Sequence, residues 1–139
     1  MTPHEIAEKS AERMWADDIA AQAHGMTLES VGPGEAALSM AATRAMTNGH
    51  GIVHGGFIFL LADTAFAYAC NSYNQRCVAQ QCSIAYLMPG REGSRLIARA
   101  REVRRVERSG VYDVSVSDES GAAIAEFRGL SRTMAGRFF

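Results

Sequence analysis

A single aspartate, Asp63, stands inside an otherwise apolar segment, FIFLLADTAFAYACNS, which covers residues 57–72. The segment is apolar nearly all round, which is typical of a buried helix rather than of a surface helix. An ionised carboxylate in such a place is costly unless something compensates it. Two interpretations fit its position: a structural carboxylate bonded to a backbone amide or to a hydroxyl such as that of Thr64, or a general base or nucleophile with a pKa tuned by a dry pocket.

A glycine-rich loop, NGHGIVHGG, covers residues 48–56 and leads into this helix. A helix that begins at His54-Gly55-Gly56 leaves its first backbone N–H groups without intrahelical partners. These donors, together with the positive end of the helix dipole, can stabilise an oxyanion, and glycine allows a substrate carbonyl to approach closely. A tight turn into a helix explains the same glycines without any chemistry.

Three other side chains of the loop are candidates for the site. Asn48 could donate its side-chain amide to the same oxygen, although an Asn-Gly pair is also a common turn former. His50 and His54 could ligate a metal ion, but no third ligand is placed beside them, and we predict neither a metal site nor a cofactor. His54 has at most a supporting role in the catalytic set, by packing at the helix start or by bonding a backbone carbonyl.

The elements that must position these residues follow from the rest of the pattern. Turn signals at Gly32-Pro33-Gly34, Pro89-Gly90, Ser109-Gly110 and Ser120-Gly121 separate them. We predict a helix over residues 3–23, which Thr2 can cap in a capping-box pattern with Glu5. Strands are predicted over 26–32 and 35–43, the buried helix over 57–72, and further strands over 77–88, 94–107, 110–119 and 122–134. The last three strands can pair as an antiparallel meander. One long helix wrapped by an antiparallel sheet satisfies this order, so we expect an α+β fold in one domain, residues 1–139.

The segment NGHGIVHGGFIFLLADTAFAYACNS, residues 48–72, resembles the signature of PaaI-type thioesterases of the phenylacetate-degradation pathway, within the hotdog superfamily. The resemblance continues through YLMPG, GVYDVSV and AEFRGLS, and it is weakest over the first twenty residues and the last few. It implies a hotdog fold with a curved sheet. It also implies hydrolysis of phenylacetyl-CoA, its ring-hydroxylated derivatives, or related aryl and short-to-medium acyl-CoA thioesters to free acid and CoA.

The resemblance further implies a role for each matching residue. Asp63 would activate water or attack the thioester, Gly55 would provide an oxyanion-hole N–H, and Asn48 would help to hold the thioester carbonyl. Some relatives place a serine near the water on the following strand, where this chain has Ala79. A hydroxyl that positions the water would then come from elsewhere, with Thr64 or Ser83 as candidates.

Substrate binding is assigned to residues near the reacting centre and along the buried helix. Gly56 and Thr64 flank the proposed chemistry. Phe66 and Tyr68 could stack on a ring or an acyl chain, although aromatic residues on a buried helix are also ordinary core residues.

The distribution of charged residues favours binding of CoA over binding of nucleic acid. The formal net charge is −1, which argues against a general polyanion binder. Lys9 is the only lysine, and seven arginines fall between Arg91 and Arg108. Because CoA carries phosphates, cationic residues should border its pantetheine tunnel, and Arg91 and Arg128 are candidates. Solvated charges on a strand face explain each of them equally well.

Three cysteines, Cys70, Cys77 and Cys82, occur without metal-ligand spacing. An odd number argues against a disulfide framework, and free thiols fit a reducing compartment. The N-terminus is polar and amphipathic, unlike a signal peptide, and the longest apolar stretch is too short for a bilayer. We therefore expect a cytoplasmic protein without a membrane partner.

The spacing of the two central residues predicts an assembly. Gly55 and Asp63 lie eight positions apart on one helix, or about 12 Å along its axis. A thioester needs its oxygen about 3 Å from the donor and its carbon close to the attacking group. Two antiparallel helices across a two-fold axis can satisfy both needs, so we predict a homodimer with shared active sites. The hotdog resemblance implies that such dimers often pair into tetramers.

Two other functions fit a hotdog chain. A non-catalytic acyl-CoA sensor would lack activity, but sensors of that kind carry a separate DNA-binding helix-turn-helix, for which this chain has no room. A dehydratase would use a His–Asp or His–Glu arrangement, which His54 allows, but Asp63 within AFAYACNS resembles the thioesterase pattern better.

Overall fold

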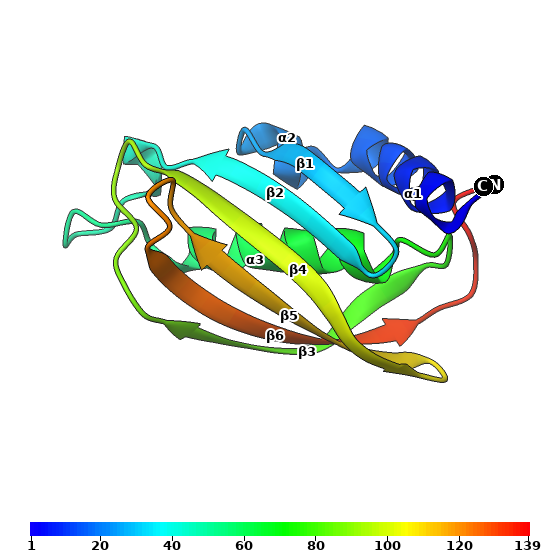
Figure 1. The fold of residues 1–139 in the computed structure, drawn as a ribbon. Coiled ribbons are helices and arrows are strands. Elements are labelled where there is room, and N and C mark those ends of the chain that lie inside the picture. The colour runs from blue at the N-terminus through cyan, green and yellow to red at the C-terminus, as the bar shows by residue number, and fades with distance from the viewer.

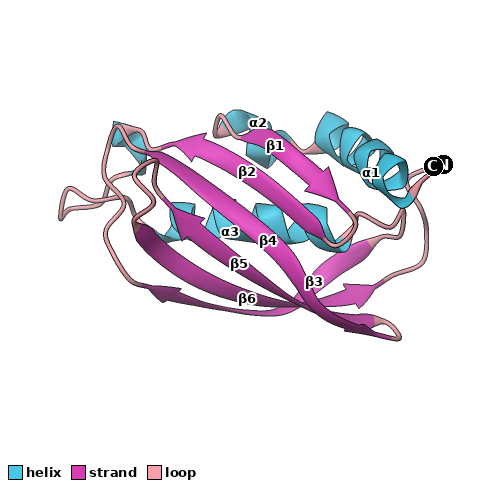
Figure 2. Cartoon of the chain, in the orientation of Figure 1, coloured by secondary structure: helices cyan, strands magenta, loops and turns pink.

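A six-stranded antiparallel sheet lies against one long helix in the computed structural model, which describes residues 1–139 (Figures 1 and 2). The two chain termini lie together at one end (Figure 1). The helices are α1 (Pro3–Asp17), α2 (Ile19–Ala23), the short 3-10 helix η1 (Arg44–Met46) and α3 (Gly55–Cys70). The strands are β1 (Thr27–Gly32), β2 (Glu35–Ala41), β3 (Cys77–Tyr86), β4 (Arg95–Val106), β5 (Ser109–Ser117) and β6 (Ala123–Thr133). The predicted hotdog architecture is confirmed.

The strand order is β1-β2-β4-β5-β6-β3, and every neighbouring pair is antiparallel. The predicted β4–β5–β6 meander is confirmed. Strand β3 follows α3 in sequence but pairs with β6 at the far side of the sheet. Its other edge has no partner in the chain, so the sheet ends in a free ten-residue edge there.

The N-terminal helix predicted over residues 3–23 is in fact two helices, divided at Asp18. The backbone of Asp18 is non-helical, with φ −84° and ψ 76°. One carboxylate oxygen accepts a backbone N–H of α2 at 3.1 Å, and the other accepts the hydroxyl of Tyr68 at 3.0 Å. The predicted capping box between Thr2 and Glu5 is present at the start of α1. None of the helices has the length and apolar character needed to cross a bilayer.

Helix α3 buries the side that faces the sheet, which carries residues such as Leu61, Ala65 and Phe66. Its opposite side is only half-buried, and Leu60, Asp63, Thr64 and Ala67 lie there. The sequence predicted burial on nearly all sides, so the chain alone leaves part of an apolar helix uncovered. This uncovered stripe contains Asp63.

The packing of Phe66 in the core leads to a prediction about stability. Phe66 is 1% exposed, and its ring packs against Tyr112 and Phe127 at centroid distances of 5.6 and 5.8 Å. Phe66→Ala should lower the free energy of unfolding by about 3–5 kcal/mol, measured by urea denaturation. Ile19→Ala, at a site 71% exposed on α2, is the control and should change stability by about 0.5 kcal/mol or less. Equal effects of the two substitutions would contradict this description of the core.

Candidate active site

Helix α3 begins with a free backbone donor at Gly55. The preceding residue, His54, is extended and caps the helix, since its Nδ1 accepts the N–H of Gly56 at 2.9 Å. The carbonyl of His54 accepts the N–H of Phe57 at 3.0 Å. The N–H of Gly55 has no acceptor in the chain. The predicted oxyanion donor is therefore available at the positive end of the helix.

The cap also defines the roles of two other predicted residues. Because the N–H of Gly56 is bonded to His54, it is not free to donate to a substrate, and Gly56 contributes only the space left by its missing side chain. An Nδ1 that accepts a hydrogen bond carries no proton itself. His54 is thus placed to organise the helix start, and it does so by accepting a backbone amide rather than by bonding a backbone carbonyl.

Asn48 lies beside Gly55 because its loop closes on itself. Its backbone N–H donates to the carbonyl of Ile52 at 2.9 Å, and its carbonyl accepts the N–H of Gly51 at 3.0 Å. The side-chain Oδ1 accepts the N–H of His50 at 2.9 Å, which leaves the side-chain NH₂ group without a partner in the chain. Asn48 and Gly55 line one hollow of about 440 Å³. The structure therefore brings the two predicted donors together.

Tyr86, at the end of β3, lines the same hollow and was not singled out from the sequence. Its hydroxyl donates to the carbonyl of Gly55 at 2.9 Å. A Cβ added to Gly55 would lie 2.9 Å from the Tyr86 ring, so this ring explains why a glycine is needed there. The signal was the aromatic residue in YLMPG, whose contact with the helix start depends on the pairing of β3.

Tyr86 should hold the Gly55 peptide for catalysis. Tyr86→Phe keeps the ring and removes one hydrogen bond, which is worth about 1 kcal/mol, so kcat should fall by roughly fivefold. Tyr86→Ala removes the packing as well and should lower kcat further, with a smaller effect on KM. Steady-state kinetics of the two variants check this order. A Tyr86→Ala enzyme with the kcat of the wild type would contradict it.

Asp63 lies two turns further along α3, outside the hollow that holds Asn48 and Gly55. Its Oδ1 is 3.9 Å from the Sγ of Cys82 on β3, and it takes part in no ion pair. Burial raises the pKa of Asp63, and the hydrogen bond from the Cys82 thiol opposes this effect. The sequence indicates Cys82 only as a free thiol, because no pattern near it in the chain places it beside the Asp63 carboxylate.

The two candidate hydroxyls differ in position. Thr64 Oγ1 donates to the carbonyl of Leu60 at 2.6 Å and lies next to Asp63 on the half-buried side of α3. Ser83 alternates with Cys82 and Ile84, which pack against the core, so Ser83 points to the other face of the sheet. Thr64 is therefore the better-placed of the two for a water near Asp63.

The aromatic pair predicted to contact the acyl group lies in the core instead. Phe66 and Tyr68 are each 1% exposed. Phe66 faces the sheet, and Tyr68 donates its hydroxyl to Asp18 while its ring packs near Trp15. Side chains this buried offer no surface to a substrate, so the prediction that they bind it does not fit the structure.

The two arginines predicted to contact CoA also differ in position. Arg128 forms two hydrogen bonds with Asp113, at 2.6 and 2.9 Å, on the outer face of the sheet. Its neighbour Phe127 faces α3, so Arg128 points away from the helix and does not border the hollow. Arg91 follows Gly90, which lines the hollow, and its exposed side chain forms no ion pair. Of the two, only Arg91 lies next to the hollow that contains Gly55.

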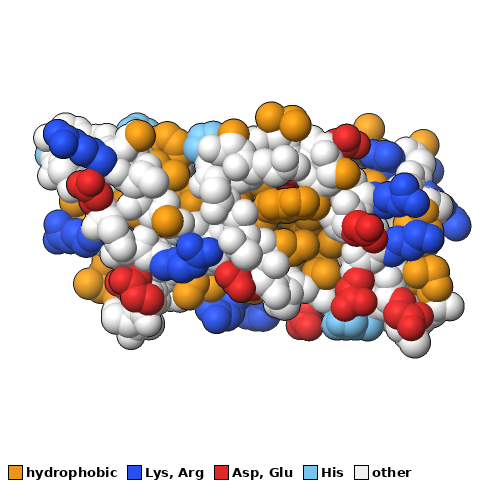
Figure 3. All heavy atoms as spheres, turned by 90° about the horizontal axis from the view of Figure 1, so that it is seen from above, with side chains coloured by type: hydrophobic (Ala, Val, Ile, Leu, Met, Phe, Trp, Pro, Cys, Tyr) orange, Lys and Arg blue, Asp and Glu red, His pale blue; other side chains and the backbone are white.

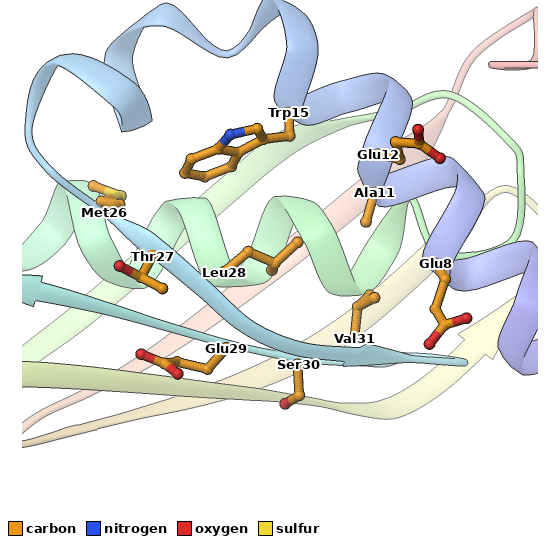
Figure 4. A pocket seen from close by; sticks show the side chains of 10 residues that line it. All are labelled: Glu8, Ala11, Glu12, Trp15, Met26, Thr27, Leu28, Glu29, Ser30 and Val31. Atoms are coloured by element: carbon orange, nitrogen blue, oxygen red, sulfur yellow. The ribbon is translucent and has the colours of Figure 1, made fainter.

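A separate hollow of about 680 Å³ lies between α1 and β1 (Figure 4). Trp15, Leu28 and Val31 form its apolar part, and Glu8 and Glu12 stand on its α1 side (Figure 4). The space-filling view from above shows apolar side chains gathered near the middle of the α1–β1 face, with charged side chains toward the ends (Figure 3). None of the residues predicted for the active site lines this hollow.

Comparisons with known proteins identify the family of the chain. Residues 50–125 match the family model described as the thioesterase superfamily. The acyl-coenzyme A thioesterase PaaI of Escherichia coli is 41% identical over 130 residues, which cover 94% of this chain and 93% of the relative. The solved structure of E. coli PaaI, from the phenylacetic acid degradation operon, superposes with a TM-score of 0.96 at 39% identity, covering 98% of this chain and 99% of that one. A Streptococcus mutans protein solved with bound acetyl-CoA is 26% identical, with a TM-score of 0.78 and coverage of 81% and 91%.

Proposed function

The chain belongs to the thioesterase superfamily as a PaaI-type acyl-CoA thioesterase, and from this premise we propose that it hydrolyses phenylacetyl-CoA, hydroxyphenylacetyl-CoA or related aryl and short-to-medium acyl-CoA thioesters in phenylacetate catabolism. The observation that carries the proposal is the pair of free donors, the Gly55 N–H and the Asn48 NH₂ group, in one hollow at the start of α3. The E. coli relative comes from an operon for phenylacetic acid degradation, which supports the choice of acyl group.

The proposed reaction transfers the acyl group to water. Asp63 takes a proton from water, or attacks the thioester carbon directly to form an anhydride that water then hydrolyses. The Gly55 amide and the Asn48 side chain stabilise the negative charge that develops on the carbonyl oxygen. CoA leaves as a thiolate, which needs little help from an acid. No metal ion or cofactor takes part in this scheme, since CoA is a portion of the substrate.

The proposed active site is shared between two chains. In one chain, Asp63 and Gly55 are separated by about 12 Å along α3, too far to act on one carbonyl. The half-buried stripe of α3 and the free edge of β3 both support a homodimer. Large apolar side chains gather on that edge and just beyond it, where Val78, Tyr86, Leu87 and Met88 are about half exposed. A second, antiparallel copy would cover them and place its Gly55 beside Asp63.

We also propose the higher assembly of the enzyme, its cellular location and one contact with CoA. Dimers pair into tetramers, as the hotdog resemblance implies, and the enzyme acts in the cytoplasm on CoA esters. Arg91, beside the hollow, contacts a phosphate of CoA.

The pH dependence of the reaction should follow the ionisation of Asp63. The reactive form is the carboxylate, so activity is present above its pKa and is lost as the pH falls through it. Because burial raises this pKa, the acid limb of kcat/KM should lie above the value of 3.8 that is ordinary for aspartate. Cys82→Ala removes a hydrogen bond that lowers the pKa, so it should move the acid limb to higher pH. Unchanged acid limbs in wild type and variant would contradict this assignment.

The substrate proposal is tested by measuring thiol release from a panel of phenylacetyl-, hydroxyphenylacetyl-, acetyl- and hexanoyl-CoA. We expect kcat/KM to be highest for the two aryl esters. A preference for acetyl-CoA would contradict the aryl assignment and leave the thioesterase class intact. Binding of all four esters without release of CoA would favour the non-catalytic alternative instead.

A further inference from the structure

Two of the three cysteines meet where α3 ends and β3 begins. Cys70 is the last residue of α3, and Cys77 is the first residue of β3. Both line one small, enclosed cavity of about 20 Å³, together with residues of β4, β5 and β6. The Cys70 thiol donates to the carbonyl of Ala67 at 3.5 Å, and the Cys77 thiol donates to the carbonyl of Gln75 at 3.6 Å. The third cysteine, Cys82, lies further along β3, beside Asp63, and does not line this cavity.

The loop between the two cysteines is held in place by one side chain. Asn71 Oδ1 accepts the N–H of Cys77 at 2.8 Å, and its Nδ2 donates to the carbonyl of Cys77 at 3.2 Å. The same Nδ2 lies 3.6 Å from the sulfur of Cys70. Asn71 therefore fixes both ends of the six-residue loop relative to one another, so the two thiols stay adjacent.

The surroundings of Cys77 favour a thiolate. The neighbouring Cys70 thiol is the largest influence that lowers the pKa of Cys77, and the Thr133 hydroxyl, 3.7 Å away, and the Arg105 guanidinium act in the same direction. Together they lower the pKa of Cys77 to about 7. The pKa of Cys70 is raised, first by the neighbouring Cys77 thiol and then by burial. The thiolate is the nucleophilic form of cysteine, so Cys77 is the reactive member of the pair.

The two thiols also differ in access. Cys70 is 3% exposed, whereas Cys77 is half-buried. Cys77 also lines a second, open hollow of about 720 Å³, which includes Arg76, Val78 and Phe138. A small oxidant that enters this hollow reaches Cys77, whereas Cys70 lines the enclosed cavity on which both cysteines lie.

We propose that Cys70 and Cys77 are a redox-active pair that hydrogen peroxide converts into a disulfide between the end of α3 and the start of β3. The Cys77 thiolate attacks one oxygen of peroxide, the O–O bond breaks, and the products are a sulfenic acid and hydroxide, which takes up a proton to form water. The sulfur of Cys70 then attacks the Cys77 sulfur and forms the S–S bond. Hydroxide leaves and takes the thiol proton as a second water, so two thiols lose two electrons and peroxide gains them. This proposal does not depend on the acyl group that the enzyme prefers.

To test the proposal, the native protein is treated with hydrogen peroxide and then denatured. Its free thiols are alkylated, and the intact mass is measured. The wild type should take up one alkyl group, on Cys82, and lose about 2 Da for the new disulfide. Dithiothreitol should restore three alkylated thiols. Cys82→Ser is the matched control and should still form the disulfide.

The variants of the pair complete the test. Cys70→Ser should leave a Cys77 sulfenic acid that dimedone traps, and Cys77→Ser should show neither the disulfide nor a dimedone adduct at Cys70. The proposal is overturned if the peroxide-treated wild type keeps three alkylatable thiols, if dimedone labels only Cys82, or if the disulfide links two chains. Circular dichroism of each variant before treatment ensures that only folded protein is compared.

Discussion

Asp63→Asn is expected to lower kcat by about 10²–10⁴-fold, with a small change in KM, because it removes the group that takes the proton from water or attacks the thioester. The substitution keeps the size of the side chain and its position on α3. Steady-state hydrolysis of phenylacetyl-CoA measures the effect. A variant as active as the wild type would remove Asp63 from the mechanism.

Stability separates this loss of activity from a loss of folding. Burial raises the pKa of Asp63 in the folded protein, so its ionisation at neutral pH works against folding. Asp63→Asn should therefore unfold at the same urea concentration as the wild type or at a higher one. Asp113→Asn is the matched control on the outer face of the sheet, where Arg128 lowers the pKa of the carboxyl. It should keep activity within about twofold, as expected for a substitution far from the site.

Gly55→Ala is expected to lower kcat by about 10²–10³-fold, the usual cost of losing one oxyanion donor. The new Cβ would lie 2.9 Å from Cζ and 3.0 Å from the hydroxyl oxygen of Tyr86. Real Cβ atoms do not come this close, so Tyr86 or the start of α3 must move. A movement of either one disturbs the hydrogen bond between Tyr86 and the Gly55 carbonyl, and a movement of α3 also displaces the free N–H.

Gly49→Ala is the matched control for this substitution. Gly49 belongs to the same loop, and a Cβ there would meet nothing within 4 Å. Its kcat should stay within about twofold of the wild type, because neither space nor a donor is lost. If the two alanine variants had the same kcat, the Gly55 amide would not be the oxyanion donor.

Local patterns in the sequence were sufficient for most of the fold. Apolar alternation and glycine–proline turns predicted all six strands to within a few residues, and the capping residues predicted the start of α1. The position of Gly55 at the start of α3 followed from the glycine pair and the apolar run. These features depend on neighbours in sequence, which is why the residues alone indicate them.

The features that the sequence did not predict correctly depend on contacts between segments that are distant in sequence. The break at Asp18 reflects its hydrogen bond with Tyr68, fifty residues away. The residue types of Phe66 and Tyr68 suit an aryl group, but the sheet covers Phe66, and Tyr68 is buried against Trp15 and Asp18. Tyr86 and Cys82 reach α3 only because β3 crosses to the far side of β6. No pattern within β3 contains that information.

In the proposed homodimer, each active site combines Asp63 of one chain with Gly55 of the other. The most direct measurement is the activity of a mixed assembly, made by co-expressing Asp63→Asn and Gly55→Ala chains with different tags and purifying through both. In a two-chain site, one of the two sites in each mixed dimer has both substitutions and the other has neither, so about half of the wild-type kcat should return. A mixed dimer no more active than either variant alone would contradict the account and place Asp63 and Gly55 of the same chain in one site.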